Sequence, residues 1–188
     1  SVLGAGGVND VVLGNVVSGT STTLLIGGGG AAQSGTPDFS GIISDRSATN
    51  PNAVGNIVIY GGGDLQLDGA NTFTGTVTVT GTGPTGLPSE LQIAGASALQ
   101  DATLVFSSTN MGIVQVASSI TAFTVGGIIG TGTFELDNAG TPFTVSVGNN
   151  NVNSTFAGTL TGAGTLNKVG QNGIFTLSGI QNPSGGLT

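Results

Sequence analysis

Two stretches of the chain repeat one pattern, and this repetition constrains the fold more than any other feature. Residues 61–79 read GGGDLQLDGANTFTGTVTV, and residues 156–188 return to a similar order of short apolar strand, glycine turn and second glycine. Repetition of this kind is typical of chains that are built from stacked, similar units. The sequence therefore predicts a regular scaffold and argues against a fold centred on one catalytic site.

The composition indicates an all-β protein. Glycine supplies 36 of the 188 residues, and short runs of Val, Ile, Leu and Thr are cut by Gly, Asn and Ser. Most runs alternate apolar and polar residues, which is the pattern of strands with one face in a core. We expect strands at residues 8–13, 22–26, 41–44, 56–60, 64–68, 76–80, 90–94, 102–106, 112–116, 122–125, 132–137, 143–147, 154–160, 164–168 and 173–178.

A solenoid explains these short strands better than a sandwich of paired hairpins, which stays the alternative. Several connections lack the Asn-Gly or Asp-Gly turns that two-residue hairpins prefer. The two repeat copies also lie far enough apart to hold several coils between them. At roughly 20–25 residues per coil, stacked at a strand spacing of about 4.8 Å, residues 1–188 form a single domain of about eight coils.

The motifs resemble the passenger-associated transport repeat, the β-helical repeat of bacterial autotransporter passengers. The first copy, near residues 39–99, supplies Phe39-Ser40-Gly41-Ile42-Ile43, Leu65-Gln66-Leu67-Asp68-Gly69, Asn71-Thr72-Phe73-Thr74-Gly75 and Thr76-Val77-Thr78-Val79. The second copy, near residues 156–188, supplies Phe156-Ala157-Gly158-Thr159-Leu160, Gly164-Thr165-Leu166-Asn167-Lys168 and Phe175-Thr176-Leu177-Ser178-Gly179. The resemblance implies a right-handed parallel β-helix, a bacterial cell-surface or secreted location, and a structural or adhesive role.

Both copies depart from the pattern of that family. The first copy carries a long insertion at residues 45–55, between its first two strands. The second copy reads Ile180-Gln181-Asn182-Pro183 where the family has Ala-Asn-Thr-Tyr.

Charge and missing residue types exclude several functions. Arg46 and Lys168 stand against nine acidic residues, for a net charge of −7, so the chain has too few cations to neutralise the phosphates of a nucleic acid. The chain has no cysteine and no histidine, the residues that most often hold zinc or act as general bases. No apolar run approaches the roughly 20 residues of a membrane span. We expect no metal, no cofactor and no membrane insertion of this segment.

Two pairs of acidic residues come closest to a catalytic arrangement. Glu135 and Asp137 project from one strand face about 7 Å apart, a separation found in inverting glycosidases. A solvated strand face explains this pair better, because no basic or aromatic residue nearby in sequence would hold a sugar. Asp64 and Asp68 are about 13 Å apart, too far for one reaction centre. We therefore expect no catalytic residue and no enzyme, with a polysaccharide-active β-helix enzyme as the remote alternative.

Four other motifs point more weakly to binding. The run Gly61-Gly62-Gly63-Asp64-Leu65 resembles a calcium-binding glycine-rich repeat, but it occurs once and such repeats work in tandem. Asn153-Ser154-Thr155 fits the pattern of a glycosylation acceptor. The outward face at Thr76, Thr78 and Thr80 resembles an ice-binding surface only if successive coils repeat it. The Asn149-Asn150-Asn151 run reads as an exposed turn, with an asparagine ladder inside the coil as the alternative.

The ends of the chain favour self-association. A solenoid ends in open strand edges, which pair readily with other chains, and neither Ser1–Gly7 nor Thr188 resembles a polar cap. We expect a processed form or segment of a longer protein, extracellular or on the bacterial cell surface, with a structural role and possible head-to-tail assembly into filaments. The alternative is an adhesive passenger module that binds a surface or matrix partner.

Overall fold

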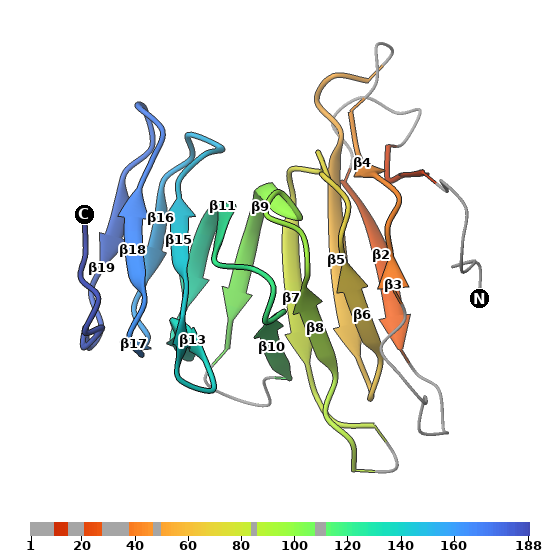
Figure 1. Ribbon diagram of the computed structural model, residues 1–188. Helices are drawn as coiled ribbons and strands as arrows, with labels where there is room; N and C mark the ends of the chain where they lie inside the picture. The colour runs from red at the N-terminus through yellow and green to blue at the C-terminus, as the bar shows by residue number, and fades with distance from the viewer. Residues whose placement is uncertain (1–9, 15–20, 28–37, 47–49, 84–85, 108–111) are drawn as a thin grey trace.

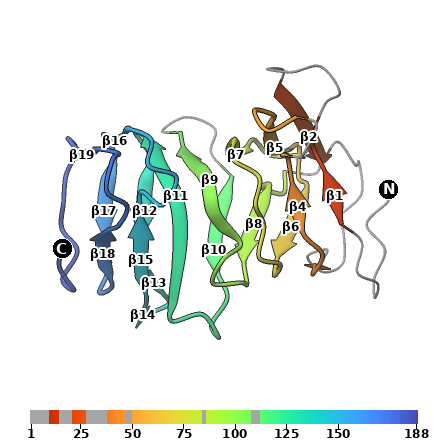
Figure 2. The ribbon, with the colours of Figure 1, turned by 90° about the horizontal axis from the view of Figure 1, so that it is seen from above.

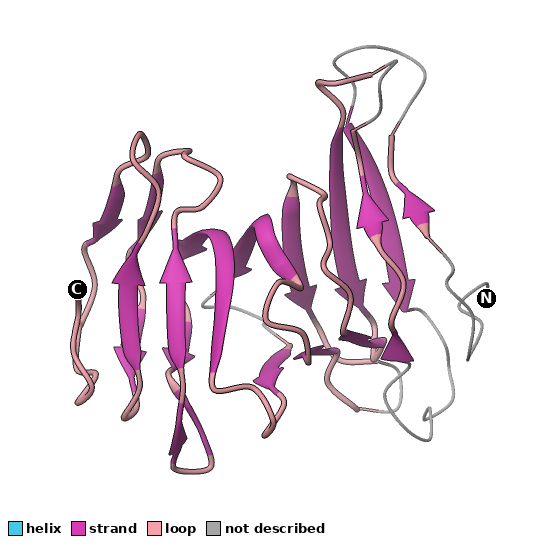
Figure 3. Ribbon diagram, turned by 45° about the horizontal axis from the view of Figure 1, so that its top comes forward, coloured by secondary structure: helices cyan, strands magenta, loops and turns pink. Residues whose placement is uncertain are grey.

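The described part of the chain is a parallel β-solenoid. A computed structural model describes residues 10–14, 21–27, 38–46, 50–83, 86–107 and 112–188. These residues contain 19 strands and no helix, wound into about five turns (Figures 1 and 3). The expected all-β class and parallel solenoid are thus confirmed. Within the same residues there is no helix that could cross a membrane.

One long parallel sheet runs the length of the stack. Its main path takes one strand from each successive layer, in the order β2 (Ser21–Gly27), β5 (Val54–Tyr60), β7 (Thr76–Thr80), β9 (Leu99–Phe106), β11 (Ala122–Gly130), β15 (Thr144–Val147) and β18 (Thr165–Lys168). Because β11 is long, it also pairs at Gly130 with β16 (Ser154–Phe156), which in turn pairs with β19 (Phe175–Leu177). All of these pairs are parallel, as expected for coils that stack in one direction.

Shorter sheets form the other sides of the solenoid. A four-stranded parallel sheet joins β3 (Asp38–Phe39), β6 (Asp64–Leu67), β8 (Glu90–Ile93) and β10 (Ile113–Val116). Two further parallel pairs are β1 (Val11–Val12) with β4 (Ile43–Ser44), and β12 (Thr133–Glu135) with β17 (Thr159–Thr161). The only antiparallel pair of strands in the described residues is the hairpin of β13 (Asp137–Asn138) and β14 (Thr141–Pro142).

The number of residues between ladder partners changes along the stack. Ser21 pairs with Val54, a step of 33 residues, whereas Asn56 bonds Thr76 across a step of 20. The step then becomes constant near the C-terminus, where Asn153 bonds Ile174 across 21 residues. The motif copy near residues 39–99 consequently spans three layers, because Phe39 pairs with Leu67 and Leu67 pairs with Ile93.

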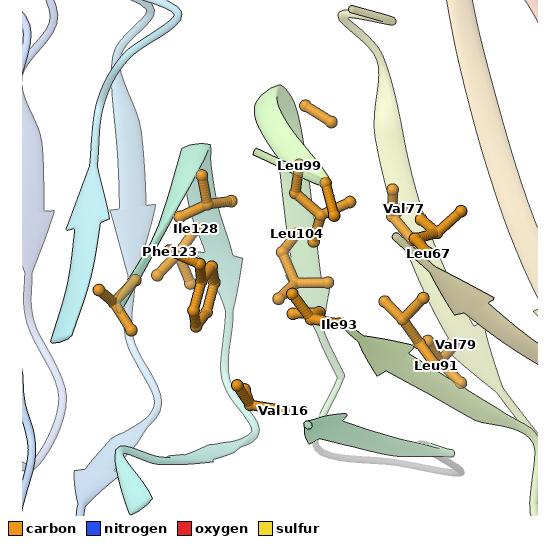
Figure 4. Close-up of a cluster of buried hydrophobic side chains, with 14 of the residues drawn as sticks. Leu67, Val77, Val79, Leu91, Ile93, Leu99, Leu104, Val116, Phe123 and Ile128 are labelled. Carbon is orange, nitrogen blue, oxygen red and sulfur yellow. The ribbon is translucent and has the colours of Figure 1, made fainter. Parts of the chain in front are cut away.

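Inward side chains form one continuous hydrophobic core. Figure 4 shows the inward side chains of the two principal sheets meeting inside the coil, with Leu67 near Val77 and Ile93 near Leu104. Each of these side chains is at most 1% exposed, and each lies above or below an apolar residue of the next layer. Burying such a side chain stabilises the fold by about 1.5–3 kcal/mol.

Side chains at the corners bond the backbone of neighbouring coils. The buried Asn71 accepts a hydrogen bond from the Ile43 N–H (2.8 Å) and donates one to the Ala98 carbonyl (2.9 Å), so it links three successive layers. Glycine lets the backbones of neighbouring coils approach closely at other corners. A Cβ on Gly158 would overlap the carbonyl oxygen of Gly132, and one on Gly179 would overlap that of Gly158.

The largest differences between predicted and observed strands occur at three of the predicted ranges. The range 132–137 divides into β12 and β13, because Ala139 (φ 49°) and Gly140 (φ 85°) form the two-residue turn of the β13–β14 hairpin. The range 154–160 divides into β16 and β17. The range 122–125 extends to Gly130, across a register shift between β11 and β9 at Val125/Gly127. Part of the range 8–13 lies outside the described residues.

Candidate functional site

The C-terminal end of the stack has an exposed strand edge. β19 pairs with β16 on one side, and no described strand pairs with its other side (Figure 2). Phe175 and Leu177 point inward but are only half-buried, since no further coil covers them. Ile180 is 61% exposed and Leu187 is 45% exposed. An edge with this much apolar surface is a template for pairing with another chain.

The last coil keeps regular contact with the coil before it. Asn182 N–H donates to the Leu160 carbonyl, and Ser184 N–H donates to the Gly162 carbonyl, both at 2.9 Å. Successive residues of a parallel strand direct their backbone N–H and C=O groups to the neighbours on opposite sides. The residue between Asn182 and Ser184 therefore directs its backbone groups to the free edge. That residue is Pro183, which has no N–H to offer there. Proline on an edge limits pairing, so the stretch of the edge open to a partner is β19 and residues 186–188.

The first described coil has similar properties. β2 pairs with β5, and among the described residues nothing pairs with its other edge. Leu24 and Ile26 point inward and are half-buried, whereas Leu25 points outward and is 62% exposed. Among the described residues, both ends of the stack therefore present half-buried core residues.

The outer face of the four-stranded sheet is acidic and rich in glutamine. Asp64 lies directly opposite Glu90 in the ladder, and Gln66, Gln92 and Gln115 follow one another on β6, β8 and β10. Burial raises the pKa of Asp64. The pKa of Glu90 is raised first by burial and second by the charge of Asp64. Neighbouring carboxylates on this face therefore repel one another when they are ionised.

The same face continues to the first described layer. Gln66 donates a hydrogen bond from Nε2 to Asp68 Oδ1 (3.1 Å). Burial raises the pKa of Asp38, and the charge of Asp68 and a hydrogen bond with that residue raise it further. Across the described residues there is no group of three carboxylates or other metal-ligating side chains placed to hold an ion.

A cavity of about 540 Å³ opens between β10 and β12. Glu135 and Asp137 both line it, but they belong to different strands, β12 and β13. Asp137 Oδ1 accepts a hydrogen bond from the Gly140 N–H (3.0 Å), and its Oδ2 accepts one from the Ala163 N–H (2.9 Å). Asp137 thus joins the hairpin to the next coil, while Glu135 is exposed at the rim.

The asparagines of the 149–151 run make local and inter-coil bonds at an exposed corner. Asn151 (φ 57°) is exposed and accepts hydrogen bonds from the N–H groups of Gln171 and Asn172. Asn149 instead donates to the Gln100 carbonyl and to Asp101. Asn153, from the glycosylation pattern, accepts a bond from the Ile174 N–H (2.8 Å).

The other predicted motifs lie at turns and on outer faces. Gly61 and Gly62 form a turn with positive φ between β5 and β6, and Asp64 begins β6. Thr76, Thr78 and Thr80 project from β7, but Val58 and Val105 flank Thr78 in the ladder, so the threonine face does not repeat on successive coils.

Sequence reasoning missed the role of Asp45. This carboxylate is fully buried in the range 45–55, which the sequence presents as an insertion. Its Oδ2 accepts hydrogen bonds from the Gly55 N–H (2.8 Å), the Thr74 N–H (2.6 Å) and the Thr74 hydroxyl (2.8 Å), and so joins two layers. No sequence signal marks it, since an aspartate in a polar loop is ordinarily exposed.

The chain matches no protein-family model, no curated protein and no solved structure. The resemblance to the autotransporter repeat stays a prediction from the motifs.

Proposed function

We propose that this protein is a structural, extracellular or cell-surface β-solenoid that assembles head to tail through its open ends. A right-handed winding of eight coils is part of the proposal. The described residues form about five turns, and the proposed count of eight coils refers to residues 1–188 as a whole. The observation that carries the proposal is the free edge of β19, with half-buried Phe175 and Leu177 beside it.

Stacking a second copy on this edge completes contacts that the last coil lacks. Phe175 and Leu177 become fully buried, and the outward N–H and C=O groups of β19 gain ladder partners. The β2 end offers the matching surface, since Leu24 and Ile26 are inward and half-buried. Contact between two different ends does not close on itself, so repeated contacts of this kind produce a filament.

The test removes one outward N–H of β19 without removing an existing bond. The backbone N–H of Leu177 faces the free edge, because the N–H of its neighbour Ser178 donates to the Phe156 carbonyl of the preceding coil. Leu177→Pro removes the edge donor, and Leu177→Ala is the control that also replaces the leucine side chain with a smaller one but keeps the N–H. We expect Leu177→Pro to stay monomeric and Leu177→Ala to assemble, as measured by sedimentation velocity over a range of concentrations and by electron microscopy.

A second variant adds a donor to the edge. Pro183→Ala restores an N–H that points outward, and one further hydrogen bond lowers the concentration needed for assembly roughly fivefold. Wild-type protein that stays monomeric at high concentration, or equal assembly of the two Leu177 variants, contradicts the proposal.

An adhesive role is the second candidate. It is favoured by the stacked glutamines and acids on the outer face of β3, β6, β8 and β10, which offer many hydrogen-bonding groups to a surface or matrix partner. We propose no enzymatic activity, because Asp137 uses both of its oxygens to accept backbone hydrogen bonds.

A further inference from the structure

The solenoid contains a break in one wall, which we call the slot: the space between the facing edges of β10 and β12. The four-stranded sheet ends at β10, and β12 pairs only with β17. Among the described residues, no strand pairs with the remaining edge of either. One side-chain hydrogen bond crosses the slot at its end, from Asn138 Nδ2 to the Val116 carbonyl (2.8 Å). On the opposite wall β9 and β11 pair directly, so the two halves of the molecule stay joined.

The slot has an apolar floor and a polar rim. Phe106 and Phe134 line the floor with ring centroids 4.7 Å apart, and the half-buried Val114 packs against the same core. Gln115 and Glu135 are exposed at the rim. Val114 is a half-buried core residue, like the inward residues at the two ends of the stack. The slot is therefore a place where a layer of strands is missing.

The charge of the slot is entirely acidic. Glu135 and Asp137 are the charged residues among the described residues that line it. Asp137 is occupied by the Gly140 and Ala163 N–H groups, whereas Glu135 has no hydrogen-bond partner in the described part of the chain. A ligand that lies beside Glu135 therefore gains most if it carries a cation.

We propose that the slot binds an extended peptide strand of a partner protein in which small apolar and basic residues alternate. β10 has four residues and β12 has three, so the facing edges suit a strand of similar length, and a cavity of about 540 Å³ lies in the usual range for ligand sites. The backbone of the peptide bonds both edges, as in β-strand addition. Its apolar side chains point towards Phe106 and Phe134, and its basic ones lie beside Glu135.

The occupant is a different protein and not a second copy of this chain. Arg46 and Lys168 are the only cations in the sequence, and Lys168 lies in β18, which is already paired with β15. No strand of the described residues alternates apolar and basic side chains. The proposal is independent of head-to-tail assembly, because it uses neither β2 nor β19.

The test uses the synthetic peptide acetyl-Thr-Val-Lys-Val-Lys-Val-amide as the probe. A second peptide replaces both lysines with glutamate, and a third carries N-methyl groups on alternate backbone nitrogens, which removes edge donors. Binding is measured by calorimetry, and amide chemical shifts locate the bound peptide on the full chain. We expect shifts at residues 113–116 and 133–135, and roughly tenfold weaker binding for each altered peptide.

Protein variants separate the slot from other acidic surfaces. Glu135→Gln weakens binding of the lysine peptide roughly fivefold, which is the upper range for one exposed ion pair. Glu90→Gln removes an equal charge from β8 and leaves binding unchanged. The proposal is overturned by shifts confined to β19, by dimer formation that shifts the slot amides without peptide, or by equal binding of all three peptides.

Discussion

The first layers and the last layers of this solenoid have the same architecture but different regularity. Among the first layers the ladder step ranges from 33 residues at Ser21/Val54 to 20 at Ile57/Val77. Between the last paired strands, β15 with β18 and β16 with β19, it stays at 21. Because loop closure depends weakly on length, a step of 33 residues costs about 0.4 kcal/mol more than one of 21. Corners can therefore lengthen at little cost, provided that the inward residues keep their register.

The two regions also differ in how their corners are joined. The early layers use side chains that are fully enclosed, namely Asp45 and Asn71. The later layers use Asn151 and Asn153, which are exposed and accept backbone hydrogen bonds across one coil step. A buried hydrogen bond is costly to leave unmade, whereas water replaces an exposed one. We expect the early layers to be the more stable part of the molecule.

The largest expected effect comes from removing a buried corner amide. Asn71→Ala leaves the Ile43 N–H and the Ala98 carbonyl without partners inside the stack, so the free energy of unfolding falls by about 3 kcal/mol. Asn151→Ala, at an exposed corner, lowers it by about 1 kcal/mol. Urea unfolding of both variants measures the difference. Equal losses of unfolding free energy in the two variants would contradict the distinction between buried and exposed corners.

An intermediate effect is expected where two coils touch through glycine. A Cβ on residue 179 overlaps the carbonyl oxygen of Gly158, so Gly179→Ala separates the last coil from the one before it, at a cost of about 2 kcal/mol. Hydrogen exchange should show lost protection in residues 175–188 and unchanged protection in β5, β7 and β9. Thr176→Ala, at an exposed position of the same coil, is the control. Loss of protection along the whole stack would show that the layers do not open independently.

The smallest expected effect concerns the two acids that face each other on β6 and β8. Because the pKa values of both acids are raised in the folded protein, it holds more protons than the unfolded chain at a pH just above their ordinary pKa values, 3.8 for Asp64 and 4.5 for Glu90. The contribution of this pair to stability is therefore greatest below pH 3.8 and declines as the pH rises through the raised values.

Glu90→Gln removes the part of that decline that comes from Glu90. It should raise the free energy of unfolding by about 0.5 kcal/mol at pH 7 and leave it unchanged below pH 3.8. Glu135→Gln, whose neighbour across the ladder is Thr161, is the matched control. Denaturant unfolding at both pH values measures the effect. A gain of the same size at both would rule out ionisation as its cause.

Much of the strand pattern could be predicted from the sequence, because alternation and glycine turns are local signals. The strands at 64–68, 76–80 and 90–94 were predicted within a residue of their observed bounds. The β13–β14 hairpin could not be predicted, because its turn uses Ala139 and Gly140 and lacks the usual Asn-Gly pair. The register between layers could not be predicted either, since the number of residues between paired strands varies with loop length.

The candidate sites depend on long-range arrangement, and this is why the sequence revealed less about them. Open ends could be expected for any solenoid, but the slot requires that β10 and β12 fail to pair while β9 and β11 pair. Asp137 looked like half of a carboxylate pair, whereas its bond to the Ala163 N–H, 26 residues away, makes it part of a corner.

The constant step of 21 residues among the last layers has a consequence for how such a protein changes in evolution. Duplication of one 21-residue unit adds a layer and leaves every inward residue facing inward. A duplication one residue shorter or longer must be absorbed at a corner, or it reverses the faces of the following strand. Gene duplication can therefore lengthen this rod in whole layers, and the rod's length becomes a heritable trait that varies in discrete units.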